Sequence, residues 1–461
     1  MTSADLDTQR ATETRPAGVS QGFLSWFADR TRATACQVTR TPLRDLRGWS
    51  LDATTGDLTH HSGRFFAIEG LHVRTSYGQV AEWSQPIINQ PEIGILGLLV
   101  KTVDGVPFGL VQAKMEPGNF NSVQVSPTVQ ATRSNYTRVH RGSRTKYLEY
   151  FTNPRPGTVV ADVLQSEQGS WFLRKRNRNM VVEVDDSVAA ADGHYWMPLD
   201  ELRSLLRIDG LVNMDTRTVL SCLPASFFAA RDRLAADGMA AALVRSISGA
   251  GTPLHSAETV LSWFTAAKSR HELAVRRVPL RALPGWRQTP EEIVHDDEKH
   301  FRIVGVSVRT NDREVGEWHQ PLLYPRGRGL VAFVVKDIGR VAHLLVHARY
   351  QAGLLDAMEM GPTVQCNPGN YHPGAGPAFL DYARHAPAER ILYDTVLAEE
   401  GGRFYHSQNR YLLVDAGDDV PVEVPEEFCW VTAHQLTGLL RHGYYVNVEA
   451  RSLLACLHSL W

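Results

Sequence analysis

The sequence has few cysteines, no long apolar run and no marked excess of charge of either sign. Its five cysteines are odd in number and widely spaced, and they form no C-x-x-C pair, which disfavours a disulfide framework or a structural zinc site. No apolar run approaches the roughly 18–20 residues that a membrane helix needs. A net charge of −2 with mixed signs argues against a nucleic-acid-binding protein, which would carry a basic field.

The N-terminal stretch lacks the features of an export signal. Residues 1–21 are polar and contain no apolar core, so we expect a disordered tail there. The composition, 43% hydrophobic and 21% charged, is typical of a globular protein, and 461 residues suffice for two or three domains. We therefore expect a soluble, cytoplasmic, multi-domain protein that binds neither membranes nor nucleic acid.

An internal repeat accounts for nearly the whole chain. The segment QVSPTVQATRSNY at 124–136 recurs as EMGPTVQCNPGNY at 359–371, and Trp83-x-Gln85-Pro86 recurs at 318–321 with the same spacing. Such self-similarity indicates a duplicated structural unit. The predicted organisation is a tail at 1–21, repeat 1 at 22–235, a linker at 236–258 and repeat 2 at 259–461, with the boundary placed at the flexible stretch SGAGTPLHS.

Each repeat combines strand-like and helix-like patterns. Apolar runs of strand length, bounded by glycine or proline, predict strands at 65–75, 93–102, 109–116, 301–310, 329–337 and 342–350. Helices are expected at 22–35, 198–207, 216–233, 259–272, 432–441 and 450–459. Runs of strands followed by helices predict an α+β layer fold present twice.

The repeats differ at polar positions. A-K-M-E-P-G-N at 113–119 aligns with A-R-Y-Q-A-G-L at 348–354, so that Lys114, Glu116 and Asn119 face Arg349, Gln351 and Leu354. Further on, Arg133, Ser134 and His140 face Pro368, Gly369 and Ala375, whereas Asn135 and Tyr136 are kept as Asn370 and Tyr371. Repeat 1 thus keeps a titratable set that repeat 2 has partly lost. If one repeat is catalytic, it is the first.

Each candidate also suits a structural role when taken alone. Lys114 could be a surface lysine, Glu116 part of a turn, Tyr136 a packing residue and His140 a loop residue. Trp83 could stack a base or fill a core, and the KRNR run at 175–178 could bind phosphate or form a solvated turn. Their co-occurrence in one repeat favours the functional interpretation.

At these residues the chain resembles the NDP-hexose 2,3-dehydratase family. The motifs are E-W-S-Q-P at 82–86, A-K-M-E-P-G-N at 113–119, V-Q-V-S-P-T-V-Q-A-T-R-S-N-Y at 123–136, and S-E-Q-G-S with K-R-N-R-N at 166–179. The resemblance implies two tandem Nudix-like repeats, a homodimer and the substrate dTDP-4-keto-6-deoxy-glucose. It further implies a 3,4-diketo-2,6-dideoxy product and functional coupling to a 3-ketoreductase.

That reaction needs a base, an acid and an oxyanion donor, and it demands no metal or redox cofactor. No G-x-G-x-x-G fingerprint opens a helix, in keeping with no nicotinamide. We expect Lys114 to stabilise the enolate or act as acid, Tyr136 to transfer a proton, and Glu116 or His140 to be the base. The expected substrate-binding residues are Trp83, Gln85, Asn119, Gln130, Arg133, Ser134, Asn135, Arg144 and Arg178, with the three arginines at the diphosphate.

Two other functions compete with this one. A Nudix-like nucleotide-sugar hydrolase would need a box of glutamates to hold Mg²⁺, but the corresponding region keeps only Glu167-x-Gly169, or Glu399-Glu400-x-Gly402. The second alternative is a non-catalytic module that binds a nucleotide sugar. The specific block in repeat 1 favours the dehydratase over both.

Overall fold

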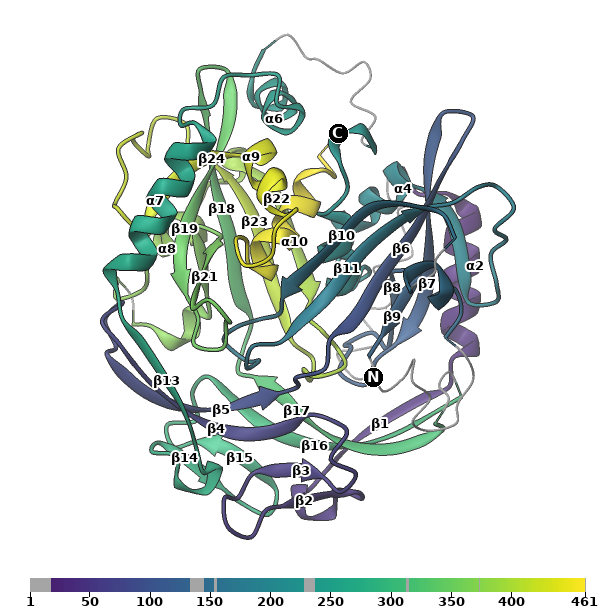
Figure 1. Ribbon diagram of the computed structural model, residues 1–461, viewed down its shortest axis with the longest axis vertical. Coiled ribbons are helices and arrows are strands. Elements are labelled where there is room, and N and C mark those ends of the chain that lie inside the picture. Colours follow the sequence, from purple (N-terminus) through teal and green to yellow (C-terminus); the bar gives the residue numbers. More distant parts are fainter. Residues whose placement is uncertain are drawn as a thin grey trace.

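The computed structural model describes residues 18–132, 145–152, 156–227, 237–311, 315–372 and 374–460. Within these ranges the chain forms four β-sheets with helices packed on them, which confirms the α+β prediction (Figure 1). The two larger sheets lie side by side in the upper part of the view, repeat 1 on the right and repeat 2 on the left. The two smaller sheets lie beneath them.

The large sheet of repeat 1 has the strand order β10-β11-β6-β7-β12, with β8 paired to β7 and β9 to β6. Only β11 and β6 run parallel among these pairs. The first seven residues of β6 are buried, as expected for an apolar strand covered on both faces. The strands are β6 (Gly94–Val103), β7 (Val106–Met115), β8 (Val123–Ser126), β9 (Val129–Ala131), β10 (Thr158–Ser166), β11 (Arg176–Glu183) and β12 (His194–Pro198).

The large sheet of repeat 2 reproduces this arrangement. Its order is β20-β19-β18-β23-β22, with β21 on β18 and β24 on β19, and β18 and β23 again form the parallel pair. The strands are β18 (Gly329–Ile338), β19 (Val341–Tyr350), β20 (Met358–Gly361), β21 (Val364–Cys366), β22 (Ile391–Ala398), β23 (Gln408–Asp415) and β24 (Phe428–Thr432). In both repeats the strands predicted from apolar runs are confirmed.

The two small sheets exchange strands between the repeats. β1 (Cys36–Thr41) of repeat 1 pairs with β16 (Phe301–Thr310) of repeat 2, with Cys36 opposite Thr310. β13 (Leu273–Val278) of repeat 2 pairs with β4 (Ala67–Thr75) of repeat 1, with Leu273 opposite Thr75. The other strands are β2 (Trp49–Leu51), β3 (Leu58–His60), β5 (Glu82–Asn89), β14 (Trp286–Gln288), β15 (Glu292–His295) and β17 (Glu317–Pro325). The repeats are therefore interlocked.

Segments that were predicted to lie outside the two repeats pack against them in the structure. Val19 is buried, and Ser20 caps α2 (Gln21–Ala33) by accepting a hydrogen bond from Phe23 N, so these residues of the tail expected at 1–21 pack with repeat 1. The stretch expected as a linker at 236–258 contains α6 (Met239–Ser248), which packs on β19. The position of a residue along the chain therefore does not by itself tell which of the two structural units it packs with.

One predicted helix is shorter than expected. The pattern at 216–233 predicts a long helix, but α5 runs from Met214 to Leu220. Residues 228–233 of that prediction lie outside the described residues. The backbone leaves the helix before Pro224, whose ring nitrogen offers no N–H for a helical hydrogen bond. The other helices are α4 (Leu199–Ser204), α7 (Ala257–Arg270), α8 (Leu380–Arg384), α9 (Ala433–Leu439) and α10 (Val448–Leu457).

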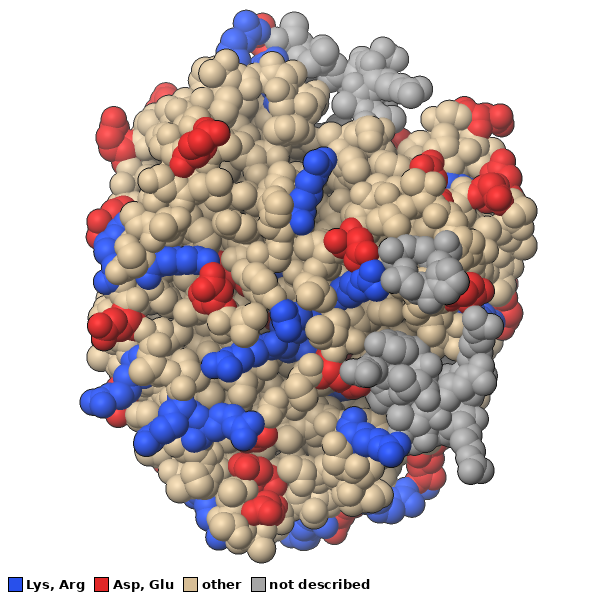
Figure 2. Space-filling model, viewed as in Figure 1, with Lys and Arg blue, Asp and Glu red and all other residues tan. Residues whose placement is uncertain are grey.

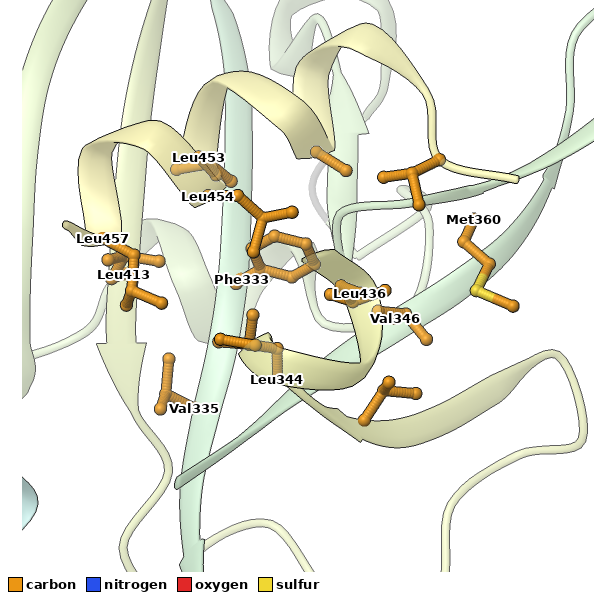
Figure 3. Packing of buried hydrophobic residues seen from close by; sticks show 14 of the residues in the cluster. Phe333, Val335, Leu344, Val346, Met360, Leu413, Leu436, Leu453, Leu454 and Leu457 are labelled. Atoms are coloured by element: carbon orange, nitrogen blue, oxygen red, sulfur yellow. The ribbon is translucent and has the colours of Figure 1, made fainter. Parts of the chain in front are cut away.

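The largest apolar core lies between the repeat 2 sheet and its helices. Figure 3 shows Leu454 of α10 directed toward Phe333 of β18, Leu457 next to Leu413 of β23, and Leu436 of α9 close to Phe333. All of these side chains are buried, and each contributes about 1.5–3 kcal/mol through removal of apolar surface from water. This packing fixes the end of the large sheet against α10.

Two buried arginines join the repeats at their centre. Arg217 on α5 donates from Nη2 to the carbonyl oxygen of Ala398 in repeat 2 at 2.8 Å. Arg451 on α10 donates from Nη2 to the carbonyl oxygen of Ser166 in repeat 1 at 2.6 Å. Both guanidinium groups are fully buried, so losing these acceptors would leave unpaired buried charge. The contact between the two repeats therefore depends on these two arginines and their acceptors.

The face shown in Figure 2 carries acidic and basic side chains interspersed over both repeats. Such a surface has no large field of one sign on this face. In the described part of the chain, no helix combines the length and apolar character required to cross a membrane.

Candidate active site

The side chains that distinguish repeat 1 meet at the end of β7. Lys114 is the next-to-last residue of β7. Glu116 and Asn119 lie in the turn that follows this strand. Glu116 and Asn119 are buried, whereas Lys114 is half-buried. The Lys114 Nζ donates to the carbonyl oxygen of Gln130, on strand β9, at 2.9 Å. Of the predicted site residues, the structure thus brings Lys114 and Glu116 together through Gln130, and Asn119 lies in the same turn as Glu116.

Gln130 connects this group through both ends of its amide. Its Nε2 donates to Glu116 Oε1 at 2.8 Å. Its Oε1 accepts from Ser126 Oγ at 2.7 Å and from Asn213 Nδ2 at 3.2 Å. Asn213 is itself fixed as the N-cap of α5, where its side chain accepts from Thr216 N at 2.9 Å. One glutamine therefore holds the lysine and the carboxylate in a defined relation.

Asp215 of α5 joins the site and was not predicted from the sequence. It is 3% exposed, and its Oδ1 has no hydrogen-bond partner among the described residues. Burial raises the pKa of Asp215 well above its usual range, nearby carboxyl groups raise it further, and Lys114 opposes the rise. The carboxyl groups are those of Glu167, Glu116 and Glu400.

Two further glutamates and a lysine complete a buried charged cluster between the repeats. Burial raises the pKa of Glu167, against the opposing effects of Arg451 and Lys175. Burial raises the pKa of Glu400 to about 8. Burial likewise lowers the pKa of Lys175, because it disfavours the charged ammonium. Perturbed groups of both signs in one place are typical of functional sites.

Repeat 2 keeps the scaffold of the site but has an amide in place of the Glu116 carboxylate. Asn447 Nδ2 donates to Gln365 Oε1 at 2.8 Å, as Asn213 does to Gln130 in repeat 1. In place of Glu116, Gln351 donates from Nε2 to Ser170 Oγ at 3.0 Å. The glutamine–asparagine contact therefore belongs to the shared fold, while the carboxylate is particular to repeat 1.

Trp83 and Gln85 do not join the Lys114 group. Trp83 Nε1 donates to Gln85 Oε1 at 3.0 Å, and Gln85 Nε2 donates to the carbonyl oxygen of Ser170 at 2.7 Å. Trp83 packs in a cluster with Ala352, next to the turn of repeat 2. Its counterpart Trp318 packs in the cluster that contains Met115, the neighbour of Lys114. Because the small sheets are exchanged, the tryptophan beside the repeat 1 turn comes from repeat 2.

Arg178 is engaged by a carboxylate. Its Nε and Nη2 bind Asp162 at 2.7 and 2.6 Å, and Arg410 binds Asp394 in the same way in repeat 2 at 2.8 and 2.6 Å. A bidentate pair present in both repeats favours a structural role over the predicted diphosphate contact. The other predicted residues, Arg133, Ser134, Asn135, Tyr136, His140 and Arg144, lie outside the described residues.

A cavity of about 340 Å³ lies between β10 and α9, with Asp162, Cys222 and Arg441 in its wall. Of the predicted site residues that the structure describes, none lines it. We therefore place the candidate site at the polar cluster, on chemical grounds. No group of three or more His, Cys, Asp or Glu side chains in the described ranges is arranged to hold a metal ion.

Comparison with known proteins decides the family. The model of the NDP-hexose 2,3-dehydratase family matches residues 20–223 and again residues 257–457. The chain belongs to the NDP-hexose 2,3-dehydratase family. Two matches in tandem also confirm the duplication. As a member of this family, the protein is a sugar-nucleotide 2,3-dehydratase.

Three relatives of this dehydratase carry the name dTDP-4-dehydro-6-deoxy-alpha-D-glucopyranose 2,3-dehydratase. That of Streptomyces violaceoruber is 52% identical over 443 residues, covering 95% of this chain and 97% of the relative. That of Saccharopolyspora spinosa is 49% identical over 444 residues, covering 95% and 91%. That of Amycolatopsis orientalis is 48% identical over 443 residues, covering 94% and 89%. The likeness extends through both repeats.

Proposed function

We propose that this dehydratase acts on dTDP-4-keto-6-deoxyglucose and eliminates its C2 hydroxyl as water, giving the 3,4-diketo-2,6-dideoxy sugar. The shared name of three relatives, each about half identical over nearly the whole chain, supports this substrate. The observation that carries the assignment to repeat 1 is the Lys114–Gln130–Glu116 arrangement, which repeat 2 does not reproduce.

The chemistry requires proton transfers and the stabilisation of one oxyanion. The C4 ketone acidifies the C3 proton, a base removes that proton, and negative charge develops on the C4 oxygen. The C2–O bond then breaks, and the hydroxyl leaves as water after an acid supplies a proton. The resulting C3 enol takes a proton at C2, releases its hydroxyl proton and becomes the second ketone. A preorganised donor aimed at the developing oxyanion lowers the barrier most effectively.

The described residues can supply these three roles. Lys114 is the oxyanion donor, because its ammonium is directed by the Gln130 carbonyl at the open end of β7. Glu116 is one candidate base, held by Gln130 Nε2. Asp215 adds a buried carboxyl group whose pKa is raised by burial, and it is the candidate acid. Asn119, with a buried Oδ1 that has no partner in the described part of the chain, is placed to bind a sugar hydroxyl.

The remaining assignments rest on the family resemblance. We propose Tyr136 for proton transfer, His140 as the alternative base, Ser134 and Asn135 at the sugar, and Arg133 and Arg144 at the diphosphate. The single parallel pair in each otherwise antiparallel large sheet suits two Nudix-like repeats. A homodimer, a cytoplasmic location and reduction of the product by a 3-ketoreductase complete the proposal. Light scattering of the purified protein tests the homodimer directly.

The deciding experiment incubates the purified protein with dTDP-4-keto-6-deoxyglucose in excess EDTA and without nicotinamide. Mass spectrometry and NMR should show loss of one water from an intact nucleotide sugar. Release of a sugar phosphate only after Mg²⁺ is restored would indicate a hydrolase instead. Binding of the sugar without any conversion would indicate a binding module.

A further inference from the structure

The turn that carries Glu116 is clamped by a loop from the other repeat. Gly118 N donates to the carbonyl oxygen of Gly401 at 2.7 Å, and His406 N donates to the carbonyl oxygen of Gly118 at 2.8 Å. A Cβ placed on Gly118 would overlap the carbonyl oxygen of Phe404, so only glycine permits this approach. Repeat 2 therefore forms one wall of the repeat 1 site.

That loop brings the carboxyl group of Glu400 close to Glu116. A Cβ placed on Gly402 would collide with Glu400 Oε1 and would lie 3.5 Å from Glu116 Oε1, so both oxygens border the same point. Glu400 is partly exposed, but its Oε2 is shielded from solvent and has no hydrogen-bond partner among the described residues. A buried carboxyl oxygen without a partner is costly unless it serves the site.

The equivalent place in repeat 2 contains amides. Glu400 corresponds to Gln168, because Glu399-Glu400-Gly401 aligns with Glu167-Gln168-Gly169. The reciprocal clamp is present, since Gly353 N donates to the carbonyl oxygen of Gly169 at 2.7 Å. At the repeat 1 turn, the carboxyl group of Glu116 lies near that of Glu400 from repeat 2. At the repeat 2 turn, the corresponding residues are the amides Gln351 and, from repeat 1, Gln168. Both members of the pair change together.

We propose that Glu400, supplied by repeat 2, is a positioning residue for the dehydration: as a neutral carboxylic acid next to Glu116, it keeps a second negative charge away from the base. A carboxyl group that is shielded from solvent beside another carboxyl group ionises less readily, so Glu400 retains its proton near neutral pH. This inference rests on the proposed function, because it assigns Glu116 to removal of the C3 proton. It makes the active site a product of both repeats.

The charges around Glu400 place its titration near the working pH. Burial raises its pKa most, Arg403 opposes this rise, and the net pKa is about 8. The other groups that face it are Glu116 and Glu167, which raise the pKa, and Lys175, which lowers it. Above pH 8 Glu400 loses its proton and becomes negatively charged. This charge repels the negative charge of the enolate that forms during the reaction. Activity should fall there.

The test is the pH dependence of kcat in the full-length protein carrying Glu400→Gln, an isostere of the protonated side chain. A residue that transfers the proton itself typically contributes about 10²–10⁴-fold, whereas this variant should lose less than about tenfold near pH 7. Its rate should no longer decline above pH 8. The matched control is Glu399→Gln, the adjacent glutamate, which accepts from Gln168 and Asn409 and should leave the decline in place.

Retention of the alkaline decline in Glu400→Gln would overturn the inference, as would a folded variant that is inactive at every pH. If Glu400→Gln does not fold, Arg403→Gln replaces it. Removing that cation should raise the pKa of Glu400 and move the decline to higher pH, and an unmoved decline would count against the proposal. A wild-type protein that forms no dehydrated sugar would refute the proposed function instead, so the two failures are distinct.

Discussion

In repeat 1 the turn after β7 presents Glu116 and Asn119, while in repeat 2 the turn after β19 presents Gln351 and Leu354 at the same places. The surrounding contacts hardly differ. Both repeats keep an asparagine bound to a glutamine, an arginine bound to an aspartate and a glycine clamped by the opposite repeat. The fold thus does not depend on the carboxylates, which points to a chemical reason for their presence in one repeat.

The sharpest test of this difference is Glu116→Gln. If Glu116 is the base, kcat should fall about 10²–10⁴-fold, because an amide accepts no proton at neutral pH. Gln351→Ala in repeat 2 should change kcat little. Initial rates from NMR of the sugar measure both. A loss below about tenfold in Glu116→Gln, with a large loss in His140→Gln, would transfer the base to His140.

Replacing Lys114 by alanine should lower kcat about 10²–10³-fold, the typical effect of removing one oxyanion donor. Arg349→Ala removes the corresponding cation of repeat 2 and should leave kcat nearly unchanged. Comparable losses in the two variants would abolish the distinction between a catalytic and a non-catalytic repeat.

The two clamped glycines separate stability from catalysis. Gly118→Ala and Gly353→Ala each push a methyl group into a backbone carbonyl of the opposite repeat, so each should cost about 1–3 kcal/mol of unfolding free energy. Only Gly118→Ala should also lower kcat, because it displaces the turn that carries Glu116. Thermal denaturation and initial rates give the two quantities. Equal rates in both variants would show that the turn tolerates displacement.

The smallest effects are expected at the paired arginines. Arg178→Ala and Arg410→Ala each remove a partly exposed ion pair, which is worth at most about 1 kcal/mol. Both should have similar melting temperatures and an unchanged KM. A raised KM in Arg178→Ala alone would restore the predicted diphosphate contact for this residue.

The strands and the grouping of Lys114, Glu116 and Gln130 could be predicted because they depend on local apolar patterns and on one contiguous block of sequence. Asp215 and Glu400 could not, because long-range folding brings α5 and a loop of repeat 2 to that block. Single-sequence patterns also could not show which tryptophan lies beside it. Duplicated strands have nearly the same pattern, so β1 can match either repeat, and only the packed structure reveals the exchange.

The exchange of β1 and β13 has a consequence for how the chain is made. β1 emerges from the ribosome early, and its partner β16 follows only after most of repeat 1 and the start of repeat 2 have been synthesised. At about 5–20 residues per second, that wait is on the order of tens of seconds. During this time the newly synthesised repeat 1 has an unpaired strand β1 and an incomplete small sheet. We therefore expect it to bind chaperones and not to be a fully folded domain. Once β1 has paired with β16 and β13 with β4, these exchanged strands should hold the two repeats together even after a protease cuts the chain between them.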